Sequence, residues 1–256
     1  MKEKNIRKEH RSEGFVRPCI LRRFGSVFGA RRRRLRNRQP GKHILCRARL
    51  ARFDIGSDSN NSAVIADSSE QLLWAGIGDA LSKEYEAVFS SKDDTLSHTP
   101  LMGKQISRIC TDPLIEYGAE ALESIREKKA SFALDQVTLD IIISTGIVSN
   151  MMSTVDSYYY NSTLAHCVYY GSTVTEHGHH HLHGEVVSLG VLCLLEFEKN
   201  DSEVERIMKF NSSIGLPVCF DDVEIDESEF EKNGGQIRSD NRMGAHALRR
   251  DPRGLY

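Results

Sequence analysis

The sequence predicts an all-α fold, a helical bundle that follows a disordered basic leader. Apolar residues between about residues 70 and 230 recur at helical spacing, with almost none of the alternation that half-buried strands show. Residues 1–54 hold 18 of the 34 Lys and Arg but only 4 of the 36 Asp and Glu, a local charge of +14 against −16 in the rest. We therefore expect a leader over residues 1–56, a helical domain over 57–232 and an irregular tail over 233–256.

The leader is Arg-rich, with four consecutive arginines at 31–34, and its self-repulsion opposes a packed core. Three interpretations compete. A nucleic-acid-binding arm has no supporting aromatic or motif pattern, and a transit peptide conflicts with the mixed charge of residues 2–13. We favour a non-native leader that arises from a frameshift or a misplaced start, which makes nucleic acid an unfavoured partner.

The domain is organised around a helix that runs from Leu72 to about Phe89, after a short strand-like piece at 63–66. One face of this helix should be buried, and its members are Leu72, Leu73, Ile77, Ala80 and Leu81. Asp79 follows a Gly-rich entry and lies beside this stripe, so its carboxylate needs a partner or a cation. The alternative is an aspartate at a helix N-terminus that interacts with the helix dipole.

More helices follow along the chain. After a polar linker at 90–100 comes a short helix at 101–110, and Asp112 and Pro113 then suit the N-cap and first residue of a helix to about 128. The next helices are expected at 131–152, 162–170, 185–198 and 201–210, separated by a Tyr-rich turn at 156–161 and a His-rich loop at 171–181, with a stop at 215–217. In the first of these helices the residues expected to be buried are Leu134, Val137, Ile141, Ile142, Thr145 and Val148.

The composition excludes several classes of protein. The six cysteines form no CxxC pair and no metal or disulfide spacing, which favours a reducing cytoplasm. We find no run of about 18 apolar residues and therefore predict no membrane span.

Two histidines lie in apolar helical settings and can join Asp79. His166 belongs to the helix at 162–170, and His183 precedes the helix at 185–198. A single histidine of this kind is more often an ordinary core residue, but two of them with an aspartate make a metal-ligand set. Asp, His and His leave one coordination position open, as catalytic divalent sites do, and the absence of thiolates favours zinc or iron.

The histidines between these two, at 177, 179, 180 and 181, admit two interpretations. They form either a metal-binding His tract or a solvated loop that binds metals incidentally. We favour the solvated loop, because only His183 is followed by an apolar helix.

Three motifs together resemble the iron-containing alcohol dehydrogenase family, in its glycerol dehydrogenase branch. They are Ala75-Gly76-Ile77-Gly78-Asp79-Ala80-Leu81, Leu164-Ala165-His166 and His183-Gly184-Glu185. The resemblance covers roughly residues 60–231 and implies the family's all-helical C-terminal domain, with Asp79, His166 and His183 as metal ligands. Lys83 stands where iron-type members often have a fourth ligand, so the three-ligand zinc form is the closer match.

The resemblance implies NAD-linked oxidation of a small alcohol or polyol, in which Zn²⁺ or Fe²⁺ acts as a Lewis acid and the cofactor accepts hydride. Residues 1–70 show no Gly-rich phosphate loop and no βαβ pattern, so the family's nucleotide-binding domain is absent where it is expected. We therefore interpret the chain as a fragment of a dehydrogenase. We expect it to be cytoplasmic, and a homo-oligomer is one option. The alternatives are a related metal enzyme (glycerol-1-phosphate dehydrogenase or dehydroquinate synthase), an inactive metal-binding remnant, and a basic-armed binding module.

Overall fold

The computed structural model describes residues 60–154 and 158–225. Across these residues no β-strand forms, and one isolated bridge pairs Ser153 with Tyr159. The elements are, in order, α2 (Asn60–Ala66), α3 (Glu70–Ala80), α4 (Ser82–Ser90), α5 (His98–Ile106), η2 (Ser107–Cys110), α6 (Asp112–Arg126), α7 (Phe132–Leu139), the π-helical segment η3 (Asp140–Ser144), α8 (Thr145–Met151), α9 (Leu164–Ser172), η4 (Gly178–His180), α10 (His183–Phe197), α11 (Asp201–Ile214) and η5 (Phe220–Val223). The all-α prediction is confirmed for these residues, whereas the predictions for 1–56 and 233–256 fall outside them.

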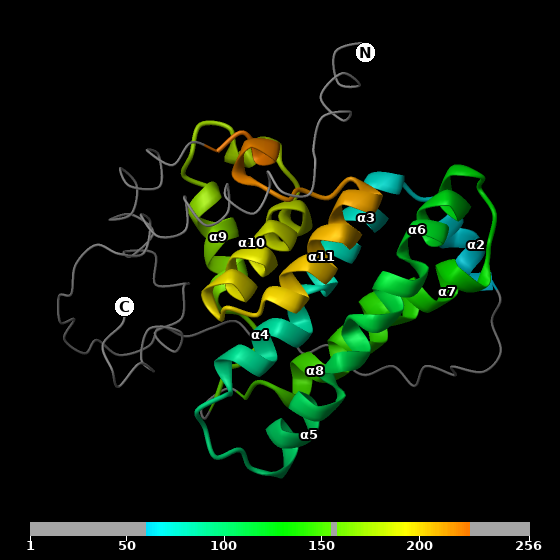
Figure 1. The fold of residues 1–256 in the computed structure, drawn as a ribbon. Helices are drawn as coiled ribbons and strands as arrows, with labels where there is room; N and C mark the ends of the chain where they lie inside the picture. The colour runs from blue at the N-terminus through cyan, green and yellow to red at the C-terminus, as the bar shows by residue number, and fades with distance from the viewer. Residues whose placement is uncertain (1–59, 155–157, 226–256) are drawn as a thin grey trace.

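Helix α10 is the centre of the bundle. Residues 186–196 of this helix are all buried, and α10 packs against α9, α3, α11 and α4. Figure 1 shows α9, α10 and α11 side by side, with the α6–α7 pair on the far side of α3. A helix that is apolar on every side is stable only when neighbours cover it all round, so the sequence of α10 dictates its central place.

The expected helix from Leu72 to Phe89 is two helices, because α3 ends at Ala80 and α4 begins at Ser82. Asp79 therefore lies at the C-terminal end of α3. The expectation that Asp79 follows a Gly-rich entry at the start of a helix is wrong. The alternative, an aspartate that interacts with the dipole at a helix N-terminus, is wrong for the same reason. Leu72 is also wrongly placed in the buried stripe, since it is 65% exposed, whereas Leu73 and Ile77 are buried.

Other boundaries differ from the prediction for local reasons. The strand-like piece at 63–66 is the end of α2, because four apolar residues alone do not distinguish strand from helix. Helix α9 begins at Leu164 and ends at Ser172, so it includes the first two residues of the expected His-rich loop at 171–181. Helix α11 continues to Ile214 and stops at Gly215, whose φ of +79° suits a residue without a Cβ.

The apolar segment α7–η3–α8 is partly exposed. Leu134, Val137 and Val148 are buried as expected, but Ile142, which lies in the π-helical segment η3, is 52% exposed. By length and composition alone, Phe132–Met151 is one helix that could cross a membrane. This differs from the sequence prediction, although a single such helix is weak evidence.

Candidate metal centre

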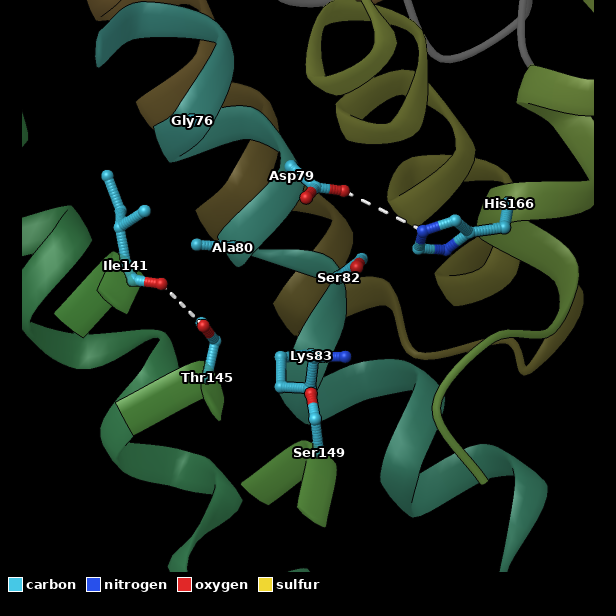
Figure 2. Close-up of a pocket in the computed structure, with 9 residues that line it drawn as sticks. All are labelled: Gly76, Asp79, Ala80, Ser82, Lys83, Ile141, Thr145, Ser149 and His166. Carbon is cyan, nitrogen blue, oxygen red and sulfur yellow. Dashed lines mark hydrogen bonds and ion pairs between the residues drawn. The ribbon is translucent and has the colours of Figure 1, made fainter. Parts of the chain in front are cut away.

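The structure brings the three predicted ligands to one point. Asp79 lies near the end of α3, His166 in the first turn of α9, and His183 at the first position of α10. His183 Nε2 lies 3.0 Å from Asp79 Oδ1, and His166 Nε2 lies 3.7 Å from the same oxygen. Figure 2 shows Asp79 and His166 facing one another.

The geometry suits a small divalent ion. One ligand atom from each of the three side chains lies within 4.8 Å of the other two, and no other group of three such side chains converges among the described residues. A tetrahedral ion with bonds of about 2.1 Å holds its ligand atoms about 3.4 Å apart, a spacing between the two distances seen here. His166 is largely covered, but the side chains of Asp79 and His183 are 48% and 40% exposed, which leaves one side open to a substrate.

Three glycines allow the ligand-bearing helices to approach closely. A Cβ on Gly184 would lie 1.8 Å from the carbonyl oxygen of Ala75 in α3, and one on Gly190 would lie 2.3 Å from the carbonyl oxygen of Ala165 in α9. Gly78 likewise faces the carbonyl oxygen of Gly184. These contacts bring the backbone at Asp79 and His166 against α10, which carries His183.

A buried carboxylate behind His166 escaped the sequence analysis. Glu86 of α4 has a fully buried side chain and lies 2.6 Å from Nδ1 of His166. Its other oxygen accepts hydrogen bonds from the backbone N–H groups of Thr163 and His166, at 2.6 and 3.1 Å. Glu86 therefore satisfies two open donors at the N-terminus of α9. An ionised carboxylate only accepts hydrogen bonds, so Nδ1 carries the proton and Nε2 is free to bind a metal.

The electrostatics of the site favour positive charge. Burial raises the pKa of Asp79, but the hydrogen bond and charge of His183 outweigh burial and bring that pKa below its ordinary value. Burial lowers the pKa of His166, but the carboxylate of Glu86 outweighs this effect and raises it. The two carboxylates thus stabilise a cation in their neighbourhood, whether a proton or a metal ion.

The expected solvated His loop is only partly solvated. His179 and His180 are exposed, as expected. His181 instead lies 3.1 Å from a carboxylate oxygen of Glu185 on α10, and its side chain is only 12% exposed. None of the histidines at 177, 179, 180 and 181 takes part in the convergent group at Asp79.

A cavity of about 200 Å³ adjoins Asp79 and His166 on the side of η3 and α8. Its lining includes two of the ligands, and Figure 2 shows all nine residues, namely Gly76, Asp79, Ala80, Ser82, Lys83, Ile141, Thr145, Ser149 and His166. Burial lowers the pKa of Lys83, and the carboxylates of Glu86 and Asp79 offset only part of that effect. The cavity therefore combines a desolvated ammonium group with two of the predicted ligands.

Comparison with known proteins identifies the relatives of this chain. No protein-family model matches it. The chain is 28% identical over 173 residues to the glycerol dehydrogenase of Thermotoga maritima, and 29% identical over 172 residues to that of Pseudomonas putida. Each match covers 65% of this chain and 45% of the relative, so the chain spans about half the length of the curated relatives it matches.

A solved structure gives the same result. The crystal structure of a probable glycerol dehydrogenase from Sinorhizobium meliloti matches with a TM-score of 0.58 at 28% identity, over 77% of this chain and 52% of that one. The resemblance inferred from the three motifs is thereby confirmed, together with the helical fold that it implied. The chain is related to the glycerol dehydrogenases, and it corresponds to their helical C-terminal part.

Proposed function

We propose that this chain forms the metal-binding half of an NAD-linked dehydrogenase for small alcohols or polyols of the glycerol type. One observation supports this proposal above the others. Asp79, His166 and His183 offer three ligand atoms within 4.8 Å of one another, on a helical domain related to the glycerol dehydrogenases. In such an enzyme the divalent ion supplies Lewis-acid polarisation of the substrate hydroxyl, and the nicotinamide supplies the hydride acceptor.

The residues of the chain would orient the reaction. Three protein ligands leave the fourth tetrahedral position for a substrate oxygen, and the exposed sides of Asp79 and His183 give access to it. Glu86 fixes the tautomer and the ring orientation of His166. The cavity beside Asp79 and His166 would hold the remainder of the substrate.

We propose Zn²⁺ ahead of Fe²⁺ as the ion. The position four residues after Asp79 is Lys83, and an ammonium group has no lone pair with which to bind a metal. We assign no NAD-binding residue, because the described residues contain no strand and no Gly-rich phosphate loop. The four described cysteines, at 110, 167, 193 and 219, are free thiols, which supports the cytoplasmic location that we propose. A homo-oligomer remains part of the proposal, as does the interpretation of the chain as a fragment.

Calorimetric titration of Zn²⁺ into the chelator-treated full chain tests the site. Because the His-rich loop can bind zinc incidentally, the titration uses a background with His177, His179 and His180 replaced by Ala. We expect one site per chain in this background and its loss on the further change His183→Ala. Zinc binding of unchanged affinity after His183→Ala would show that these residues are not the ligands.

A further inference from the structure

The cavity beside the candidate metal centre contains two polar groups that lack partners. Lys83 makes no hydrogen bond or ion pair with the residues that the structure describes, and its side chain lines the cavity. The hydroxyl oxygen of Ser82 also has no hydrogen-bond partner there, although this residue is only 1% exposed. Buried polar groups nearly always have partners, so the buried hydroxyl of Ser82 beside the half-buried side chain of Lys83 indicates a polar ligand.

The charges around the cavity indicate the sign of that ligand. With a divalent ion at Asp79 and His166, the ion and Lys83 together bring three positive charges, and Asp79 and Glu86 bring two negative ones. The net single positive charge is matched by a monoanion. A neutral polyol would leave the ammonium group of Lys83 with only the partial compensation that the carboxylates of Glu86 and Asp79 provide.

The size and position of the cavity limit the ligand further. Its volume of about 200 Å³ is below the roughly 300–1,000 Å³ of pockets for drug-sized ligands, so the ligand is small. Asp79, near the end of α3, and Lys83, in the first turn of α4, both line this small cavity. A group bound at Lys83 and an oxygen bound at the metal centre can therefore belong to adjacent carbons of one small molecule.

We propose that the cavity binds the carboxylate of a small 2-hydroxy acid at Lys83, with the acid's hydroxyl directed to the metal centre. This proposal rests on the proposed function and names its substrate class. Oxidation of such an acid moves a hydride from the hydroxyl-bearing carbon to NAD⁺, releases the hydroxyl proton and leaves the 2-oxo acid. Ser82 donates its unpaired hydroxyl hydrogen to the ligand.

Glycolate and ethylene glycol form the matched probe pair, since they differ only in a carboxylate against a hydroxymethyl group. Each is titrated into the Zn²⁺-loaded full chain at constant ionic strength, after the zinc affinity has been measured by itself. We expect glycolate to bind more tightly than ethylene glycol, and Lys83→Gln to weaken glycolate about ten- to hundredfold, as for the loss of a charged hydrogen bond. Lys83→Gln should leave ethylene glycol binding unchanged within about twofold.

Control variants separate this role from a structural one. Lys92→Gln removes the same charge from the surface, where Lys92 pairs with Glu198, and should leave both affinities unchanged. The Lys83→Gln variant should bind zinc at least as tightly as the original chain, because the substitution removes a positive charge near the ion. Its zinc affinity also shows whether the site is folded. If the Lys83→Gln variant does not fold, two other variants replace it. Lys83→Arg is expected to retain glycolate binding, and Ser82→Ala is expected to weaken it.

The outcomes are distinct. Failure of the original chain to bind zinc would overturn the proposed function, and this inference with it. If the chain binds zinc but has equal affinity for the two probes, this inference alone is overturned. The same holds if Lys83→Gln leaves the glycolate affinity unchanged. Inorganic phosphate that displaces glycolate at equal or lower concentration would identify a phosphate site and would likewise overturn it.

Discussion

Gly184, at the start of α10, lies against the carbonyl oxygen of Ala75 in α3, where an added Cβ would approach that oxygen to 1.8 Å. No side-chain rotation relieves such a contact, because both sides of it are backbone. The contact lies one residue from His183 and four from Asp79, and it therefore fixes the distance between two of the candidate ligands.

We predict that Gly184→Ala separates α3 from α10. Overpacking of a tight contact costs about 1–3 kcal/mol of folding stability, and the displaced Asp79 should weaken zinc binding at the same time. Thermal unfolding and zinc titration measure the two effects. Gly146→Ala in α8 is the matched control, since a Cβ there meets nothing within 4 Å. It should stabilise the chain by up to about 1 kcal/mol, and equal behaviour of the two variants would contradict this account.

Glu86→Gln should weaken the metal site without unfolding the chain. The amide retains the size of Glu86 but loses the charge that holds the Nδ1 proton of His166. Loss of an outer partner of this kind typically costs about 10- to 100-fold in metal affinity, which zinc titration measures. Glu84→Gln on the same helix is the control, because Glu84 faces Arg108 rather than His166. An unaltered zinc affinity in Glu86→Gln would leave Glu86 with a structural role only.

Asp140 should make the stability of the fold depend on pH. Burial raises the pKa of this carboxyl group in η3 from 3.8 to about 7, and the neighbouring hydroxyl of Ser144 opposes only part of that rise. The folded chain therefore binds more protons than the unfolded chain between pH 4 and 7. The stability associated with this group is complete below pH 4 and is lost as the pH rises to 7, by up to about 1.4 kcal/mol per pH unit.

Asp140→Asn should remove that dependence. We expect the variant to be more stable than the original chain at pH 8, with a smaller difference at pH 4.5, as measured by denaturant unfolding at the two values. Asp135→Asn, five residues earlier and less buried, serves as the control for the loss of a carboxylate from this segment. A parallel profile for Asp140→Asn and the original chain would show that Asp140 is already ionised in the folded state.

The full chain by itself should show little or no glycerol-dependent formation of NADH. It matches about 45% of the length of its relatives, and no residue in it is assigned to the nicotinamide. Holding the cofactor against the substrate can contribute roughly 7–11 kcal/mol to lowering the barrier. A fusion in which the nucleotide-binding domain of a relative replaces residues 1–56 should form NADH, and His183→Ala should abolish this activity. Rapid formation of NADH by the unmodified chain would show that it holds a cofactor site to which no residue has been assigned.

The three side chains named from the sequence converge in the structure, but the sequence predicted their surroundings less well. Asp79, His166 and His183 could be found because each lies within or next to an apolar helical pattern, and periodicity is a strong local signal. Glu86 could not be found in this way, since its partner lies 80 positions away and their contact depends on how α4 meets α9. The same limit explains Leu72, whose exposure depends on the packing around α3 rather than on its own spacing.

The break at Leu81 and the π-helical turn at Asp140 were missed for a related reason. Both lie inside segments whose composition suits an unbroken helix, and tertiary packing overrides that preference. The tight backbone contacts had a visible signal, because glycine is disfavoured within helices and both Gly184 and Gly190 lie in one. Only the structure shows which neighbour each glycine meets.

The spacing of those two glycines sets the register of α10. They lie six positions apart, which amounts to about 600° of rotation at 100° per residue, so Gly184 and Gly190 face two different neighbours, α3 and α9. An insertion or deletion of one residue between them would turn one contact by about 100° while the other stayed in place. The length of this segment should therefore tolerate no change, even where the identities of its apolar residues can be exchanged.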